Sequence, residues 1–155
     1  GGNFRLHELQ AAFLRVKLGH LDSALKRRRN LALRLCEVLR EKWKAIMPLD
    51  SCVCRGQGGE RETVPGHVYL PFSCHAGPGE HTWNQFSIRV TGPGQRDGLK
   101  EKLGSKGIQT EVYYPRAMHE QECFESSRES FPTAEKLATE ILTLPLTERS
   151  CLHLA

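Results

Sequence analysis

The 155 residues are enough for one domain with its own hydrophobic core and are short for two. With 39% hydrophobic and 26% charged residues, the composition excludes a mostly disordered chain. The net charge of +4 is mild, and no apolar run approaches the roughly eighteen residues that a membrane-spanning helix needs. We therefore expect a folded protein that does not associate with membranes.

The cysteines lie scattered through the chain and form no dense framework: Cys36, Cys52, Cys54, Cys74, Cys123 and Cys151. Because no secretory signal precedes them, we interpret them as reduced thiols of a cytoplasmic protein. A zinc site would have to use Cys52, Cys54, Cys74 and His75, which lack the paired spacing of zinc ligands. We expect no metal site. The chain begins without Met at the edge of an apolar-periodic segment, so we expect a piece of a longer protein.

The first predicted helix runs from about Arg5 to Leu18, where Gly19 weakens or breaks it. Its apolar residues recur at steps of three and four: Leu6, Leu9, Phe13 and Val16. Asn3 precedes this helix, at a place where N–H groups are unpaired. Locally, Asn3 is either an ordinary N-cap or part of a site for an anion such as phosphate.

The second predicted helix is capped by Asp22 or Ser23 and continues to about Lys44, before Pro48. Its apolar stripe comprises Leu31, Leu35, Val38, Leu39, Trp43 and Ile46. The basic run at residues 26–29 has no interleaved aromatic residues, and acidic residues follow it on the same helix. We interpret it as a solvated or interface surface, and binding to nucleic acid is the weaker alternative.

The rest of the chain alternates between short strands and helices. The predicted strands cover residues 68–70, 86–90, 108–114 and 142–146. One predicted helix is capped by Asp97 and followed by a left-handed Gly107, and the last opens at Pro132. The sequence thus predicts an α+β protein, with two long N-terminal helices followed by a small antiparallel or mixed sheet covered by helices. We divide it into connecting helices (1–47) and a small C-terminal domain (48–155), within one structural unit.

Several motifs in order resemble the C-terminal part of the DegT/DnrJ/StrS aminotransferases. They are Asn3-Phe4-Arg5-Leu6 with Glu8-Leu9-Gln10-Ala11-Ala12, residues 81–90 (HTWNQFSIRV), residues 111–115 (EVYYP) with His119, residues 131–135 (FPTAE) and residues 142–146 (LTLPL). The matches span nearly the whole chain at consistent spacing. Residues 52–66, 125–130 and 147–155 depart from the family pattern.

The resemblance implies the small C-terminal domain of a fold type I enzyme that uses pyridoxal phosphate (PLP) to aminate nucleotide-linked keto-sugars. Such an enzyme takes part in polysaccharide, O-antigen or secondary-metabolite sugar biosynthesis, with glutamate as the expected donor. PLP chemistry needs a Schiff-base lysine, which the family carries in its N-terminal domain. No lysine here stands in that motif, so we expect no catalytic residue in this chain and no activity from it alone.

By resemblance, Asn3 reaches the PLP phosphate of the partner subunit in a homodimer. The resemblance places Arg5, Tyr113, Tyr114 and His119 near the nucleotide-sugar. Alternatives remain open: Arg5 can form a salt bridge, one tyrosine can face the core, and His119 can be a surface residue. A second hypothesis for the whole chain is a truncated, non-catalytic relative that serves as a dimerisation or binding module.

Overall fold

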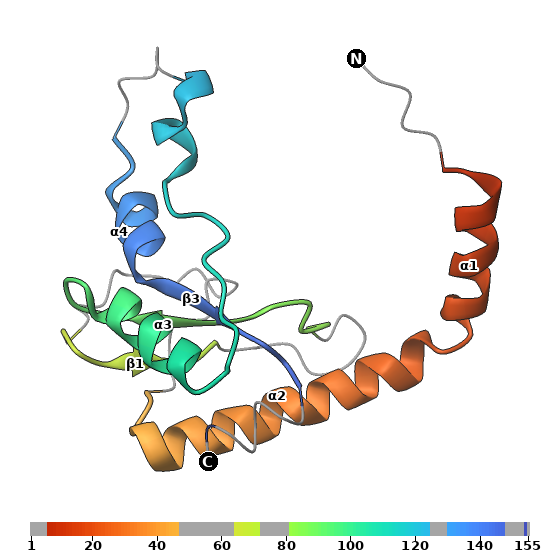
Figure 1. Cartoon of the computed structure of the whole chain (residues 1–155), viewed down its shortest axis with the longest axis horizontal. Helices are drawn as coiled ribbons and strands as arrows, with labels where there is room; N and C mark the ends of the chain where they lie inside the picture. Colours follow the sequence, from red (N-terminus) through yellow and green to blue (C-terminus); the bar gives the residue numbers. More distant parts are fainter. Residues whose placement is uncertain (1–5, 47–63, 72–80, 125–129, 148–153, 155) are drawn as a thin grey trace, which may run out of the picture.

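The computed structural model describes residues 6–46, 64–71, 81–124, 130–147 and 154 of the chain. It confirms the predicted α+β architecture: two helices come first, followed by a three-stranded antiparallel sheet with further helices around it (Figure 1). The elements are α1 (Glu8–Leu18), α2 (Leu21–Trp43), β1 (Val68–Tyr69), β2 (Phe86–Val90), α3 (Gln95–Ser105), the 3-10 turns η2 (Met118–Glu120) and η3 (Glu122–Phe124), α4 (Pro132–Glu140) and β3 (Ile141–Leu144).

The N-terminus of α1 differs from the prediction. The helix begins at Glu8, and its N-cap is His7, whose Nδ1 accepts the Leu9 N–H at 3.3 Å. The Gln10 side chain accepts the His7 N–H in return, at 3.1 Å. The N-cap position of α1 is therefore taken by His7, and the predicted cap Asn3 lies outside the described residues.

The two N-terminal helices are separated at Gly19, as predicted. The N-cap of α2 is His20, and both predicted caps, Asp22 and Ser23, lie inside the first turn, where the Ser23 hydroxyl donates to the His20 carbonyl. The helix ends at Trp43 because Lys44 adopts a left-handed conformation with φ of 52°.

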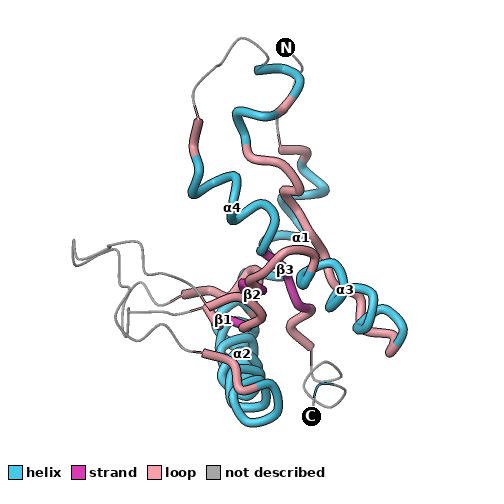
Figure 2. Tube along the Cα trace, turned by 90° about the vertical axis from the view of Figure 1, so that its left-hand side faces the viewer, coloured by secondary structure: helices cyan, strands magenta, loops and turns pink. Residues whose placement is uncertain are grey.

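The sheet has the order β1-β2-β3, with both pairs antiparallel. Alternation divides β2 and β3 into two faces. One face carries the buried residues Phe86, Ile88, Val90, Leu142 and Leu144, which pack with Leu35 and Leu39 of α2 and Leu103 of α3. Helix α2 therefore covers one face of the sheet, and α4 lies on the opposite side (Figure 2).

Two predictions about the C-terminal half are confirmed and two are wrong. Gly107 has a φ of 75°, and α4 has Pro132 in its first turn. However, α3 is capped by Gly94 rather than Asp97, because the helix begins at Gln95 and Asp97 already lies in its first turn. Residues 108–114 form no strand: only Glu111 bridges Thr143, and the chain then leaves the sheet edge.

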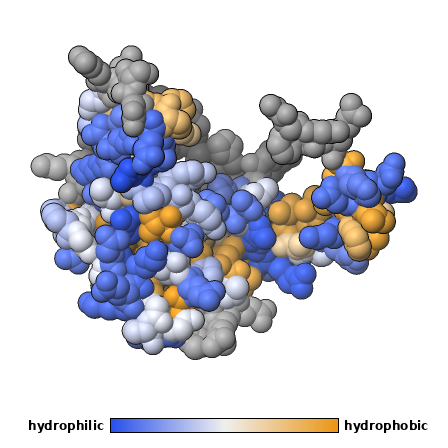
Figure 3. Space-filling view, turned by 45° about the horizontal axis from the view of Figure 1, so that its top comes forward, coloured by the Kyte–Doolittle hydropathy of each residue, from blue (hydrophilic) through white to orange (hydrophobic). Residues whose placement is uncertain are grey.

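The two N-terminal helices differ in burial. The C-terminal half of α2 contributes Ala32, Leu35 and Leu39 to the core, whereas no residue of α1 is buried. Helix α1 and the first turns of α2 project from the body as an arm that shows apolar surface (Figures 1 and 3).

Among the described residues, no helix combines the length and apolarity that crossing a membrane requires. The division at residue 47 stays a prediction.

Candidate functional site

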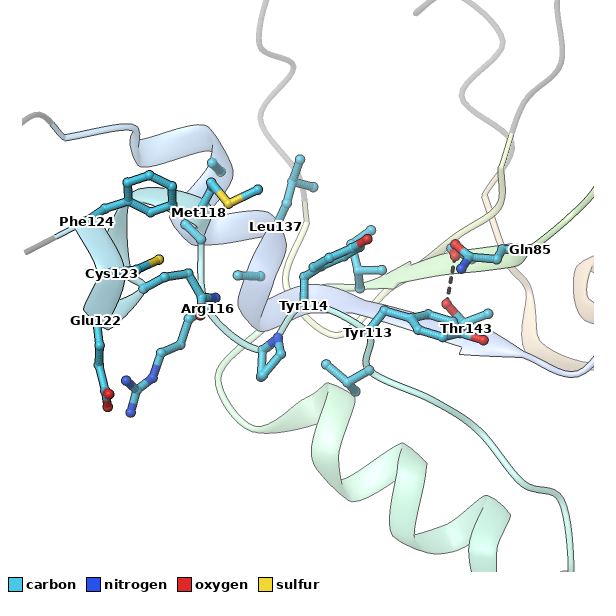
Figure 4. Close-up of a pocket in the computed structure, with 18 residues that line it drawn as sticks. Gln85, Tyr113, Tyr114, Arg116, Met118, Glu122, Cys123, Phe124, Leu137 and Thr143 are labelled. Carbon is cyan, nitrogen blue, oxygen red and sulfur yellow. Dashed lines mark hydrogen bonds between the residues drawn. The ribbon is translucent and has the colours of Figure 1, made fainter. Parts of the chain in front are cut away.

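A cavity with a volume of about 1130 Å³ lies on the face of the sheet opposite α2, and Figure 4 shows residues that line it. Three groups of residues line it: Gln85 just before β2 with Ser87, Ile141 and Thr143 of the sheet; Ala134, Leu137 and Ala138 of α4; and Val112–Ala117, Met118 and Gln121–Phe124 of the segment that precedes α4. Apolar atoms dominate the lining, and a few polar groups interrupt it, as is usual in ligand sites.

The floor of the cavity is the polar face of the sheet. Ser87 and Thr143 are paired across β2 and β3, and their hydroxyl oxygens are 2.8 Å apart in a hydrogen bond. They point away from the core because their neighbours Ile88 and Leu142 point into it. The same alternation that builds the core thus places two hydroxyl groups in the cavity.

Tyr113 and Tyr114 form the aromatic part of the cavity. Both line it, and their exposed fractions are 52% and 73%. The alternative that one of them faces the core is therefore wrong: the chain leaves the sheet after Glu111, and Val112 is the residue that packs against the core. Tyrosine rings in such a place can stack on a sugar and donate a hydrogen bond.

The end of the cavity away from Thr143 holds its two charged residues. Arg116 and Glu122 lie there with Met118, Cys123 and Phe124 (Figure 4). Within the described part of the lining, these two side chains are the only ones with a formal charge.

His119 occupies a different place from the tyrosines. It lines a smaller neighbouring cavity of about 390 Å³ with Met118, Phe124, Phe131 and Ala134. Its Nε2 lies 3.0 Å from Glu135 Oε1. The pKa of Glu135 lies below its ordinary value, first because its carboxylate accepts the backbone N–H of Phe131 and next because it accepts a hydrogen bond from His119.

The structure does not place every predicted residue. Asn3 and Arg5 lie outside the described residues, as do Cys52, Cys54, Cys74 and His75. In the described ranges, no group of three or more His, Cys, Asp or Glu residues is arranged to hold a metal ion. Ser87, Thr143 and Gln85 line the cavity without having been predicted to do so, although the strand alternation that identified the core already placed Ser87 on the other face.

The lining of the cavity does not match the needs of PLP. This cofactor requires a lysine amine for its imine and an acidic partner for its ring nitrogen. The described lining contains no lysine, and its one acid, Glu122, stands beside Arg116 at one end. The described residues therefore do not hold PLP by themselves, and we assign no chemical step to them.

Comparison with known proteins supplies the context. The family model described as "DegT/DnrJ/EryC1/StrS aminotransferase family" matches residues 1–51 and 62–152. The chain is 30% identical, over 148 residues, to a dTDP-3-amino-3,6-dideoxy-alpha-D-galactopyranose transaminase of Aneurinibacillus thermoaerophilus, and the match covers 95% of the chain and 33% of the relative. It is 33% identical to a dTDP-3-amino-3,4,6-trideoxy-alpha-D-glucose transaminase of Streptomyces venezuelae, with 94% and 32% covered.

A solved structure agrees with these relatives. The chain superposes on a DegT DnrJ EryC1 StrS aminotransferase from Brucella abortus with a TM-score of 0.67 and 26% identity, covering 97% of this chain and 34% of that one. The chain thus spans about a third of the length of the proteins that it matches.

Proposed function

Because the chain belongs to the DegT/DnrJ/EryC1/StrS aminotransferase family, we propose that it is the C-terminal part of a PLP-dependent nucleotide-sugar aminotransferase. The enzyme transfers an amino group from glutamate to a keto-sugar nucleotide, for polysaccharide, O-antigen or secondary-metabolite sugars. The observation that carries the proposal is the family match over nearly the whole chain. Two relatives that are named transaminases of dTDP-linked amino sugars support the substrate class, and this substrate class favours a cytoplasmic location.

The cavity supports a substrate-binding role for this part of the enzyme. Hydroxyl groups of Ser87 and Thr143 stand at one end, the two tyrosines in the middle and Arg116 at the other end. This order suits a ligand with sugar hydroxyls, an apolar ring face and an anionic group. In this proposal Tyr113 and Tyr114 contact the nucleotide-sugar.

The cofactor belongs to the part of the enzyme that precedes this chain. That part supplies the Schiff-base lysine, and PLP bound there provides the electron sink for amino transfer. Asn3 is proposed to reach the PLP phosphate of the partner subunit in a homodimer, and Arg5 to contact the substrate. Both roles come from the family resemblance and require a dimer in which each chain completes the site of the other.

Amino transfer by the protein encoded by the whole gene tests the proposal. With ¹⁵N-glutamate and dTDP- or UDP-linked keto-sugars, we expect ¹⁵N in the sugar product by mass spectrometry. The 155-residue chain alone is the control and should be inactive. If the whole gene product binds PLP but labels no sugar nucleotide, the proposed substrate class is wrong.

The second candidate is a non-catalytic module that pairs with an intact aminotransferase subunit. The exposed apolar residues of α1 and the absence of lysine from the described cavity lining favour it. Size-exclusion chromatography of the chain mixed with an intact relative tests it directly. Separate elution of the two proteins would remove this candidate.

A further inference from the structure

His119 joins two parts of the chain that are distant in sequence. Its Nε2 lies 3.0 Å from the Oε1 atom of Glu135, and its ring packs against Phe131 with centroids 5.0 Å apart. The His119 side chain is only 13% exposed. It does not line the larger cavity, so little of its surface is available to a ligand there.

Glu135 is a fixed acceptor for this histidine. The same Oε1 atom accepts the Phe131 N–H at 3.0 Å and the Ser130 hydroxyl at 3.1 Å. These bonds stabilise the carboxylate and hold it over the N-terminus of α4, where a negative charge is also favoured by the helix dipole. An N–H donated by His119 therefore meets an acceptor that is already oriented.

The contact links two walls of the larger cavity. One wall is the segment that carries Tyr113, Tyr114 and η2–η3, and the other is α4 with Ala134 and Leu137. Several hydrogen bonds of residues 112–124 are local: the Val112 N–H donates to the Glu111 side chain, and the Ala117 N–H donates to the Glu120 side chain. The hydrogen bond from His119 to Glu135 therefore ties this segment to α4.

We propose that His119 is a positioning residue, not a substrate contact. Through Glu135 it holds the segment 112–124 at a fixed distance from α4, and so sets the position of Tyr113 and Tyr114 in the cavity. The identity of the ligand, a nucleotide-sugar, rests on the proposed function; the link between the two walls does not. This role replaces the one that the family resemblance suggested for His119.

The first test uses the 155-residue chain. His119→Ala, Glu135→Ala and the double variant are compared by urea denaturation and by the rate of trypsin cleavage after the exposed Arg116. If the contact is the tether, each single variant lowers the urea midpoint of unfolding and speeds cleavage after Arg116. The double variant then shows no further change beyond the larger of the two single effects. His119→Gln keeps a hydrogen-bond donor, so its urea midpoint and its cleavage rate should stay close to those of the unmodified chain. His20→Ala, at an exposed histidine without a side-chain capping bond, is the control and should change neither measurement.

The second test uses the whole enzyme and the KM values of both substrates. Glu135 lines neither cavity, so it acts on the substrate only through its partners: His119 on the segment, and Phe131 and Ser130 at the start of α4. We expect His119→Ala to raise the KM for the nucleotide-sugar roughly tenfold. Glu135→Ala should raise it at least as much, the double variant should match Glu135→Ala, and the KM for glutamate should stay unchanged. A KM that rises in His119→Ala alone would show direct contact and overturn the proposal.

The two tests separate the possible failures. If the whole gene product transfers no amino group, the proposed function fails, and the first test still decides whether the tether exists. Additive losses of stability in the double variant would overturn the tether whatever the substrate is.

Discussion

Helix α1 and the C-terminal half of α2 have similar apolar patterns and opposite environments. Leu9, Phe13 and Val16 of α1 have exposed fractions of 66%, 71% and 69%, whereas Leu35 and Leu39 of α2 are fully buried. The difference arises because α2 meets the apolar face of the sheet and α1 projects from the body. A periodic pattern therefore shows that a helix has an apolar face, and the tertiary structure determines what covers it.

The largest expected difference between the two helices is in stability. Leu39→Ala should lower the free energy of unfolding by about 2–5 kcal/mol, because it leaves a cavity against the sheet. Phe13→Ala should change it by less than about 0.5 kcal/mol, because its side chain is already exposed. Urea denaturation of the chain measures both. Leu33→Ala is the matched control, since Leu33 lies on the same helix as Leu39 and is 60% exposed. Equal losses for Leu33 and Leu39 would contradict the assignment of the buried face.

Thiol reactivity gives a second measure of burial on α2. Burial raises the pKa of Cys36 to about 11, although Arg40 opposes the shift. At pH 8 only about one thiol in a thousand is then ionised, and the thiolate is the reactive form. We expect iodoacetamide to modify Cys36 at least about a hundredfold more slowly than the exposed Cys123. Peptide mass spectrometry measures both rates in one sample. Similar rates would show that α2 does not stay packed on the sheet in solution.

The N-cap of α1 should have a smaller and local effect. His7→Ala removes the acceptor for the Leu9 N–H and should destabilise the first turn by about 0.5–1 kcal/mol. Because no residue of α1 is buried, the midpoint of global unfolding should stay the same while the amides of α1 exchange faster. Hydrogen exchange followed by mass spectrometry distinguishes the two regions. A shift of the global midpoint would mean that α1 folds as one unit with the core.

The smallest expected effect is the pH dependence contributed by Glu135 in α4. Its pKa is lower in the folded protein than its ordinary value of 4.5. The stabilisation is therefore complete above that value and is lost as the pH falls below it through the folded-state pKa. Glu135→Gln should flatten this part of the stability profile, measured by urea denaturation between pH 3 and pH 6. An unchanged profile would show that the carboxylate does not take part in the interactions seen here.

Local patterns predicted the helices and the three strands of the sheet, but not how the helices are capped. The helical stripes and the alternation at Phe86, Ile88 and Val90 are strong signals that tertiary context did not override. The N-caps are His7, His20 and Gly94, and of these only His7 forms a side-chain capping bond. The presence of a good capping residue type therefore did not locate the starts of these helices. The prediction of a strand at 108–114 is wrong. Alternating apolar residues also occur in an irregular segment that packs one side against the core, and in this segment only Glu111 pairs with β3.

The candidate site shows the same division. Tyr113 and Tyr114 were predicted from the family motif, and both line the cavity. His119 was assigned to the same place, but its partner Glu135 lies 16 residues away, and nothing in the spacing alone shows that the two side chains meet. Ser87 and Thr143 lie within the motifs at residues 81–90 and 142–146, but no motif assigned them a role, and their contact follows only from the pairing of β2 and β3.

The sequence by itself determined the class of this protein: its apolar periods define two helices and a small sheet, and its ordered motifs identify the aminotransferase family. The tertiary structure alone decided which apolar faces are covered and which polar groups share the cavity. The physical reason is that periodicity fixes the orientation of side chains within one element. Contacts such as those between Ser87 and Thr143, or His119 and Glu135, depend on how separate elements pack.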